Sequence, residues 1–451
     1  MKVFFFVPPV AATRFYLISL LVIGLILLGV TSAAIASGLQ QNRYKSTADP
    51  DMKDVGLRSR HNLNHIYHFD LKPLGSRTPV ILLPGRAEEF QDIAWWKKFH
   101  KMARRDKDFN QHYKLYIFVY DSKQQLEAQS LDFSREFKAY FSRVSPDQRP
   151  ILITYSLGGV IARDAMRDPD VYNLVSTVFG IAVPYHGSPM FDPDWFARYL
   201  HHPLHSPIRT AWDRLIYRAY MFNKTNLTDG LKWDNFDRSM PQFDGAHLKI
   251  LGDHVTDDIP AYHENMSVPG FKKKLIVYAS YLENGYTHSN QPFNPIRLPK
   301  YVFDTTASLP REAIESVLPF YGFTVHSVFT YMNNQMANLP TFTPTQPKGK
   351  NTNLYRFNDG AIPLSSTLYL PARNEPYNDN FQGLIKARDV AGIRVFVNLD
   401  HMHVGQYSMF GSRLRGTDVL HPKDGIRTPN EWLLYDLKRL HETPDASPAA
   451  L

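Results

Sequence analysis

Cysteine is absent from the 451 residues of this chain. Without a thiol, the protein has no disulfide, thiolate metal site, iron–sulfur cluster or cysteine nucleophile. The absence does not decide the compartment, because a chain without cysteine suits oxidising and reducing surroundings alike. A strong excess of either charge is also lacking, since 51 Lys and Arg stand against 43 Asp and Glu, for a net charge of +8. Spread over the whole chain, this excess does not indicate nucleic acid as a partner.

No charged residue occurs between Arg14 and Arg43. Residues 15–30 are almost entirely apolar, and small uncharged residues follow them. The whole segment, 15–38, meets the length of about 20 residues that a helix needs to cross a bilayer. An A-x-A pattern that begins at Ala34 is also typical of a signal-peptide cleavage site. We therefore expect either a membrane anchor or a cleaved signal peptide here, and with it a protein that is tethered to a membrane or exported, for example to a periplasm.

Short apolar runs alternate with helical segments through most of the remaining chain. The runs are Pro79–Leu83, Leu115–Tyr120, Ile151–Thr154, Val175–Val183, Lys274–Ala279 and Ile393–Val397. They are continuously apolar, which is typical of parallel strands that are buried on both faces. The pattern predicts the α/β class, with a mostly parallel sheet and helices on both of its faces.

Two predicted helices between these strands are amphipathic. In the first, at 95–105, Lys and Arg share one face. That basic face is either the solvated side of a packed helix or a contact for anionic lipid headgroups. In the second helix, at 123–143, Leu131, Phe137 and Phe141 help to form the apolar side.

Two long irregular segments interrupt the alternation of strands and helices. The first is rich in aromatic residues, is expected to contain a helix at Ala211–Phe222, and predicts an inserted cap. A capping box from Thr428 to Glu431 predicts the start of a final helix, with Leu433, Leu437 and Leu440 as its buried stripe. The predicted organisation is an N-terminal basic segment 1–14, an anchor or signal 15–38, a linker 39–75, an α/β domain 76–441 with a cap 189–270 and a second insertion 284–353, and a tail 442–451.

The segment around Ser156 has the pattern of a nucleophile elbow. A strand leads into a sharp turn with Ser156 at its apex, and a helix that begins with small residues follows. The N–H groups at the start of such a helix supply positive potential for an oxyanion. Thr154 departs from the G-x-S-x-G pattern, in which a glycine takes its place. The alternative is an ordinary strand–helix turn of a nucleotide-binding fold, but a phosphate loop would follow the first strand and contain more glycines.

Five motifs, in this order along the chain, together resemble the α/β-hydrolase lipases. The motifs are Ile81-Leu82-Leu83-Pro84-Gly85-Arg86, Tyr155-Ser156-Leu157-Gly158-Gly159, Ala182-Val183-Pro184-Tyr185-His186-Gly187-Ser188, Asn358-Asp359-Gly360-Ala361-Ile362-Pro363 and Asp400-His401. The chain is most similar to bacterial triacylglycerol lipases and more loosely to lecithin–cholesterol acyltransferase and GPI-inositol deacylase relatives. The similarity covers about 79–190, 273–282 and 355–410. It implies the α/β-hydrolase fold and hydrolysis of carboxylic esters, foremost those of lipids.

The resemblance also assigns roles to five residues. It implies Ser156 as the nucleophile, Asp359 as the acid and His401 as the base, in the chain order of α/β-hydrolases. In such a triad the imidazole takes the serine proton, and a buried carboxylate holds the imidazole tautomer. The backbone N–H groups of Arg86 and Leu157 match the family's oxyanion donors.

Each assignment outside the elbow has an alternative. Asp359 also fits an ordinary Asn-Asp-Gly turn, and His403 competes with His401 for the role of base. The lipases that this chain resembles often place a calcium-binding Asp two residues after the base, where this chain has His403, so no calcium site is implied. No H-E-x-x-H, EF-hand or P-loop spacing occurs, and we expect neither a metal nor a cofactor.

The predicted function is therefore that of a serine hydrolase acting on lipid or other esters at a membrane surface. A lipid acyltransferase or a phospholipase is the alternative within enzymes. A catalytically inactive hydrolase fold that binds a ligand in the cell envelope is the alternative outside them. The sequence indicates no nucleic-acid partner and does not determine the oligomeric state.

Overall fold

The computed structural model describes nine parts of the chain: 63–70, 72–85, 91–121, 124–188, 267–283, 333, 355–371, 380–404 and 418–442. All of them belong to one compact unit, Asp54–Gln291 with Thr324–Leu451. The predicted anchor, nearly all of both insertions and the tail beyond 442 lie outside the described residues. Within the described parts, no helix combines the length and the apolar character that crossing a membrane requires.

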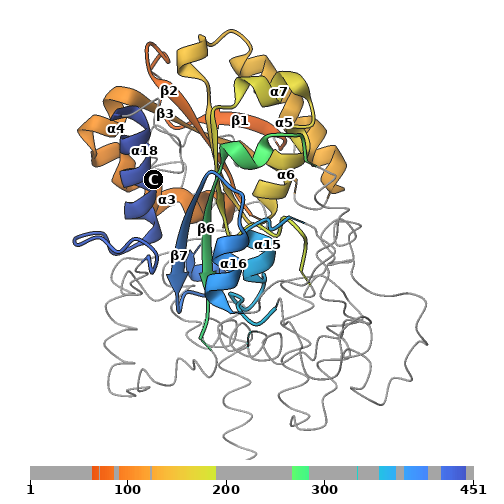
Figure 1. The fold of residues 1–451 in the computed structure, drawn as a ribbon. Coiled ribbons are helices and arrows are strands. Elements are labelled where there is room, and N and C mark those ends of the chain that lie inside the picture. The colour runs from red at the N-terminus through yellow and green to blue at the C-terminus, as the bar shows by residue number, and fades with distance from the viewer. Residues whose placement is uncertain are drawn as a thin grey trace, which may run out of the picture. The chain divides into compact units, whose positions relative to one another are not determined.

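A single seven-stranded sheet forms the centre of the described structure (Figure 1). The strands are β1 His65–His68, β2 Thr78–Leu83, β3 Tyr113–Val119, β4 Ile151–Tyr155, β5 Thr177–Ile181, β6 Leu275–Tyr281 and β7 Gly392–Val397. Their order in the sheet is β1-β3-β2-β4-β5-β6-β7. Only β1 runs antiparallel to its neighbour, and all other described pairs are parallel. The prediction of a mostly parallel sheet is confirmed.

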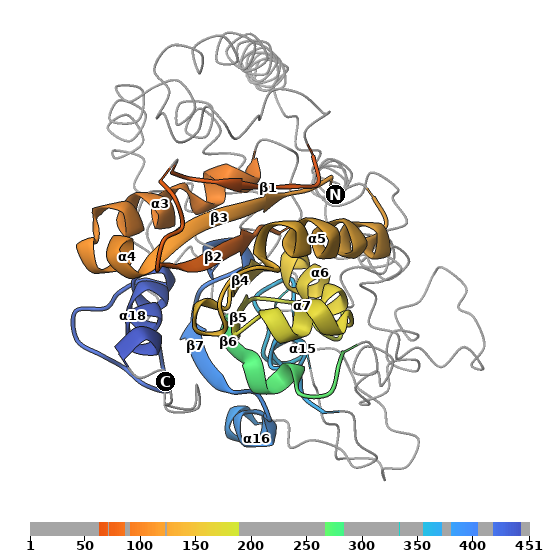
Figure 2. The same ribbon diagram turned by 90° about the horizontal axis from the view of Figure 1, so that it is seen from above.

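Helices cover both faces of this sheet, as the sequence predicts (Figure 2). One face carries α3 Gln91–Arg105, α4 Lys107–His112 and α18 Pro429–Glu442, and the other carries α5 Leu126–Phe141, α6 Leu157–Ala165 and α7 Pro169–Leu174. The shorter elements are η2 Pro146–Gln148, η5 Phe271–Lys274, α15 Leu364–Thr367, α16 Phe381–Ala387 and α17 His401–Val404. Because helices bury both faces of the sheet, the central strands are continuous apolar runs in the sequence.

The sheet begins earlier than the sequence predicts. Residues 39–75 were expected to form a linker, but β1 lies within them and pairs with β3. The pairing is extended by a hydrogen bond from the Asn64 N–H to the Val119 carbonyl at 2.7 Å. The apolar pattern misses this strand because it lies at the edge of the sheet and buries only Ile66 fully. The α/β unit therefore extends at least from His65 to Glu442.

Two helices test the predicted apolar stripes. In α5, Phe137 and Phe141 are buried as expected, but Leu131 is 65 % exposed, so its assignment to the apolar side was wrong. Leu131 lies two residues before the buried Phe133, and two residues correspond to about 200° around a helix. The stripe of α18 is buried at Leu433 and Leu437 and half-buried at Leu440.

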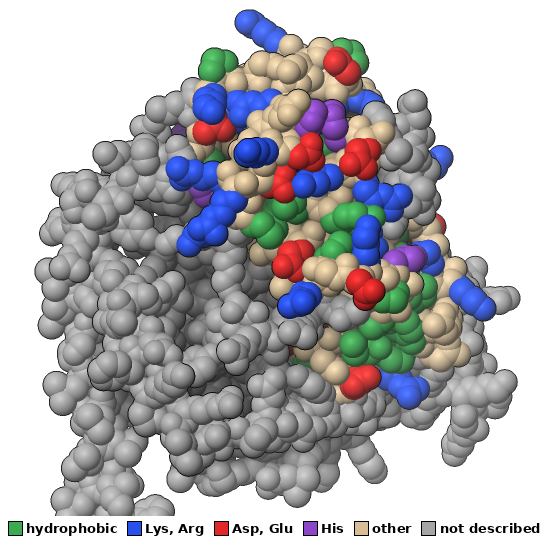
Figure 3. Space-filling view, turned by 90° about the vertical axis from the view of Figure 1, so that its left-hand side faces the viewer, with side chains coloured by type: hydrophobic (Ala, Val, Ile, Leu, Met, Phe, Trp, Pro, Cys, Tyr) green, Lys and Arg blue, Asp and Glu red, His purple; other side chains and the backbone are tan. Residues whose placement is uncertain are grey.

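The capping box of α18 forms as the sequence predicts. The Thr428 N–H donates to the Glu431 carboxylate at 3.0 Å, and the Glu431 N–H donates to the Thr428 hydroxyl at 3.3 Å. The side of the molecule on which α4 and α18 lie carries Lys and Arg interspersed with Asp and Glu (Figure 3). Lys438, for example, pairs with Asp106 at 2.7 Å. Among the described side chains, this surface is therefore not uniformly basic.

Candidate active site

Ser156 lies at the sharp turn between β4 and α6. Its backbone has φ 49° and ψ −123°, a conformation that is strained for any residue with a Cβ. The turn is held by a hydrogen bond from the Ser156 N–H to the Ile181 carbonyl at 3.0 Å and by one from the Gly159 N–H to the Ser156 carbonyl at 3.0 Å. Strain that is kept in place by a neighbouring strand and the following helix points to a functional position.

The glycines after Ser156 allow α6 to approach the sheet closely. A Cβ on Gly158 would overlap the carbonyl oxygens of Leu83 and Pro84 at the end of β2. A Cβ on Gly159 would overlap the Val183 side chain beyond β5. The small residues of the elbow are therefore needed for packing between the helix and two strand ends.

Thr154 is accommodated at the position where the elbow pattern has a glycine. The residue is fully buried on β4, and its hydroxyl donates to the Phe179 carbonyl on β5 at 3.0 Å. The buried polar atom is thereby satisfied. Its partner in the β4–β5 register is Gly180, and the Tyr185 side chain fills the space that a Cβ on Gly180 would need. The departure from the pattern leaves the strand pairing intact.

Asp359 is both a turn residue and a partner of His401, so the two interpretations of its motif are compatible. One carboxylate oxygen, Oδ1, accepts hydrogen bonds from the Ala361 N–H at 2.9 Å and the Ile362 N–H at 2.6 Å. The other, Oδ2, accepts a hydrogen bond from Nδ1 of His401 at 2.8 Å. The side chain is buried. The turn thus orients the carboxylate toward the imidazole.

His401 joins this carboxylate to Ser156. It is the first residue of α17, which follows the end of β7 closely. Nδ1 faces Asp359, and Nε2 lies 3.1 Å from the Ser156 hydroxyl oxygen. These partners assign the proton to Nδ1 and leave Nε2 as the acceptor of the serine proton. The structure therefore brings together three side chains that are 42 and 245 positions apart along the chain.

The other residues considered in the sequence occupy different places. Leu157 is the first residue of α6, so its backbone N–H belongs to the end of the helix next to Ser156. Arg86 lies outside the described residues. His403 belongs to α17, but its side chain is not among those described. His186 is buried, and its Nε2 lies 2.7 Å from the Leu370 carbonyl oxygen.

Sequence reasoning missed a support of the Asp359 turn. Asn333 is buried, and its amide donates to the Asn358 carbonyl at 2.9 Å and the Leu282 carbonyl at 3.3 Å. The Asn358 amide donates in turn to the Asn333 carbonyl at 3.3 Å. Asn333 thus ties the end of β6 to the residue just before Asp359. No sequence signal marks it, because it is one of several Asn residues within the insertion 284–353, and Asn334 follows it directly.

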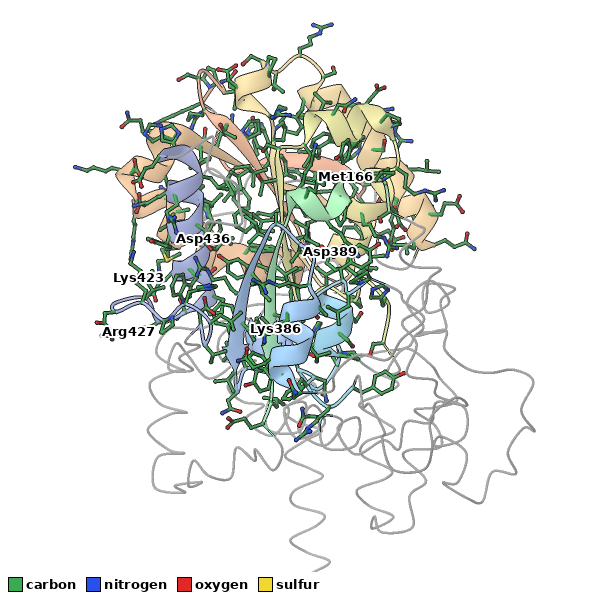
Figure 4. The ribbon with its side chains drawn as sticks, in the orientation of Figure 1. Met166, Lys386, Asp389, Lys423, Arg427 and Asp436 are labelled. Atoms are coloured by element: carbon green, nitrogen blue, oxygen red, sulfur yellow. The ribbon has the colours of Figure 1, made fainter. Side chains whose placement is uncertain are left out.

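A buried ion network fixes β7, the strand that leads to His401. Arg394 on β7 donates to both carboxylate oxygens of Asp436, at 3.0 and 2.6 Å, and to Asp418 at 3.0 Å. Asp436 belongs to α18 (Figure 4). The Tyr278 hydroxyl on β6 donates to Asp436 as well. Burial, reinforced by the Asp436 charge, raises the pKa of the Tyr278 phenol well above its ordinary value. Two strands and the last helix therefore share one polar cluster.

Groups of three or more His, Asp or Glu side chains that are placed to hold a metal ion do not occur among the described residues. The described residues of the site present a hydroxyl, an imidazole and a carboxylate that are joined by hydrogen bonds.

Comparisons with known proteins add solved structures of low similarity. No family model and no curated protein matches the chain. The mature lipase BlEst2 of Bacillus licheniformis has a TM-score of 0.37 and 14 % identity, over 77 % of this chain and 94 % of that one. Lipase 1 of Pelosinus fermentans has a TM-score of 0.35 and 10 % identity, with coverages of 82 % and 99 %. EstA of Clostridium botulinum has a TM-score of 0.34 and 12 % identity, with coverages of 74 % and 85 %. With TM-scores this low, none of these structures assigns an activity to this chain.

Proposed function

We propose that this protein is a serine hydrolase that cleaves carboxylic esters through an acyl-serine intermediate. One observation carries the proposal, namely the hydrogen-bonded series from the Ser156 hydroxyl through His401 to the Asp359 carboxylate. The series starts at a strained turn between a strand and a helix, as a nucleophile elbow requires. Each group has the chemistry that its position demands.

In the first half-reaction, Ser156 Oγ attacks the carbonyl carbon of the ester while His401 Nε2 takes the hydroxyl proton. A bond forms between Oγ and the carbon, and the carbonyl π electrons move to the oxygen. The Leu157 N–H at the start of α6 is suited to stabilise this oxyanion, with the Arg86 N–H proposed as the second donor. Asp359 stabilises the imidazolium that forms on His401.

Collapse of this intermediate breaks the bond between carbon and the alcohol oxygen. The alcohol leaves with the proton from His401 Nε2, and the acyl group stays on Ser156. Water then attacks the acyl carbon while His401 takes its proton, and the second collapse returns that proton to Ser156. The products are the alcohol and the carboxylic acid, and the enzyme is regenerated.

A pair of serine variants tests the proposal. Ser156→Ala should abolish both hydrolysis of a short p-nitrophenyl ester and labelling by a fluorophosphonate probe. Ser176→Ala, just before β5, is the matched control, because the Ser176 hydroxyl donates only to the Arg149 and Pro150 carbonyls before β4 among the described contacts. Activity of Ser156→Ala within about tenfold of wild type would overturn the proposal, because losses at a triad run to orders of magnitude. An unlabelled wild type would favour an inactive binding protein.

We also propose lipids as the ester class and a membrane as the location. The uninterrupted apolar segment 15–30 and the resemblance of the sequence motifs to lipases support this. The full chain should stay with membranes during carbonate extraction, because burial of this segment outweighs surface electrostatics. A mature N-terminus at Ser37, mapped by mass spectrometry, would instead establish a cleaved signal peptide. Hydrolysis of butyrate esters with no activity on long-chain esters in vesicles would contradict the lipid proposal.

A further inference from the structure

Tyr155 is adjacent to Ser156 along the chain and to His401 in space. Its hydroxyl donates to the backbone carbonyl of His401 at 2.8 Å. Its ring is stacked on the imidazole, with centroids 5.3 Å apart and planes inclined by 30°. The side chain is only 3 % exposed. The residue before the nucleophile therefore contacts both the main chain and the ring of the residue that faces the nucleophile.

The backbone of His401 is held at both of its polar groups. Its N–H donates to the Asp359 carbonyl at 2.9 Å, while its carbonyl accepts from Tyr155. The Tyr155 ring is itself confined, because a Cβ on Gly85 would come within 2.7 Å of it. Asp359 and Tyr155 thus fix the start of α17 from two directions, which in turn sets the place of Nε2 relative to the Ser156 hydroxyl.

The stacked ring has a second consequence once His401 is protonated. The proposed reaction makes an imidazolium on His401 in each half-reaction. An aromatic face within about 6 Å of a cation attracts it through the ring quadrupole. The centroid distance of 5.3 Å satisfies this condition. The ring therefore lies where it can attract the imidazolium of each half-reaction, and His401 itself exposes little surface to water.

We propose that Tyr155 is a positioning residue for His401, with its hydroxyl fixing the main chain of the base and its ring stabilising the imidazolium. The proposal rests on the proposed serine-hydrolase function. The two parts are separable, because replacement by Phe removes the hydroxyl and keeps the ring, whereas replacement by Leu removes both. A displacement of about 1 Å at a reacting group can cost about a hundredfold in rate, so the loss of this hydrogen bond should be measurable.

The alternative is that Tyr155 only stabilises the fold, as many buried tyrosines do. Tyr113 provides the matched control, since it is also buried and its hydroxyl also donates to a backbone carbonyl, that of Leu437 on α18. Its partner belongs to the packing of α18 against β3 and not to the Ser156–His401–Asp359 series. Tyr113→Phe therefore measures what the loss of a buried phenol-to-carbonyl bond does to this protein in general.

The experiment compares Tyr155→Phe, Tyr155→Leu and Tyr113→Phe in the full chain. The readouts are kcat and KM for p-nitrophenyl butyrate, and the Tm. Tyr155→Phe should lower kcat about tenfold or more with KM nearly unchanged. Tyr155→Leu should lower kcat further, because the imidazolium that forms during the reaction loses its aromatic neighbour. Tyr113→Phe should lower the Tm but keep kcat within about twofold of wild type.

Tyr155 variants whose kcat and KM match those of Tyr113→Phe would overturn the proposal. If Tyr155→Leu does not fold, Tyr155→Phe alone tests the proposal. A kcat that falls with KM unchanged supports it, and a kcat equal to that of Tyr113→Phe contradicts it. Fluorophosphonate labelling separates this outcome from a failure of the proposed function. A labelled wild type with unaffected Tyr155 variants refutes only the role of Tyr155, whereas an unlabelled wild type refutes the hydrolase itself.

Discussion

Asp359 and His401 are joined by two hydrogen bonds, one through side chains and one through the backbone. The Asp359 carboxylate accepts from the imidazole at 2.8 Å, and the Asp359 carbonyl accepts from the His401 N–H at 2.9 Å. The same residue therefore orients the ring and anchors the main chain that carries it. The position of the imidazole depends on the whole turn 358–362 and not on the carboxylate alone.

Loss of the Asn333 side chain should loosen this turn. Asn333→Ala removes the amide that donates to the buried Asn358 and Leu282 carbonyls. The Asn358 carbonyl still accepts from the Leu282 N–H at 2.9 Å, so the Leu282 carbonyl is the group that loses its donor among the described contacts. We expect the free energy of unfolding to fall by about 1–3 kcal/mol, the usual cost of an unsatisfied buried group. We also expect kcat to fall, because the Asp359 carboxylate follows the turn. Urea denaturation and ester kinetics measure the two effects.

Asn110→Ala is the control for this variant. The Asn110 amide donates to the Ala103, Arg104 and Asp106 carbonyls between α3 and α4, away from the turn of Asp359. It should lower stability without changing kcat. A kcat of Asn333→Ala equal to that of Asn110→Ala would show that Asn333 does not support the acid.

The strain at Ser156 should be visible as a stability difference between two inactive variants. Alanine keeps the Cβ that makes φ 49° unfavourable, whereas glycine removes it. We expect Ser156→Gly to have a free energy of unfolding about 1 kcal/mol higher than Ser156→Ala. Thermal and urea denaturation of both proteins test this. Equal stabilities would mean that the turn relaxes when the hydroxyl is removed.

The two histidines of α17 should differ in their effect on activity. His401→Ala should lower kcat/KM by about as much as Ser156→Ala, since residues that act as a unit show similar single losses. His403→Ala should leave the activity close to that of wild type. Ester kinetics of the two purified variants show which histidine is the base. A larger loss of activity in His403→Ala than in His401→Ala would show that our proposal assigns the proton transfer to the wrong histidine.

The Arg394 network should be costly to break. Arg394→Met removes the guanidinium that bonds the buried carboxylates of Asp418 and Asp436, which should lower the free energy of unfolding by about 3–5 kcal/mol at neutral pH. His421, whose Nδ1 lies 3.6 Å from the Asp418 carboxylate, stays in place in this variant.

Arg135→Met is the matched surface control. Arg135 is 68 % exposed and pairs with Asp132 at 2.8 Å on α5. Its loss should cost less than about 1 kcal/mol. Urea denaturation at neutral pH measures both variants. A loss of stability in Arg394→Met that is no larger than that in Arg135→Met would contradict the account of the buried ion network.

The sequence predicts most of the sheet because its central strands are buried on both faces. A residue pattern reports burial, so β2, β4 and β5 stand out as apolar runs, whereas the edge strand β1 does not. Leu131 shows the opposite error, because an apolar side chain is no proof of burial.

The residues of the candidate site also differ in whether the sequence alone identifies them. The elbow of Ser156 is local, and a strand, a turn and small residues mark it within ten positions. The Asn-Asp-Gly sequence at Asp359 predicts a turn but not a catalytic role, and only the resemblance to a family indicates that role. Tyr155 and Asn333 could not be found at all, because their partners lie 246 and 25 residues away and the contacts depend on the completed fold.

The order of the strands has a consequence for the protein during its synthesis. The Ser156 turn is complete once β2, β4 and β5 have formed, which requires only the part of the chain up to residue 188. Asp359 and His401 arrive with the strands that are added last at one edge of the sheet. A ribosome-bound chain that ends before residue 401 lacks the histidine that faces Ser156. A truncated product that ends there lacks it as well. The triad of the hydrolase that we propose is thus complete only when the C-terminal part of the chain has joined the sheet.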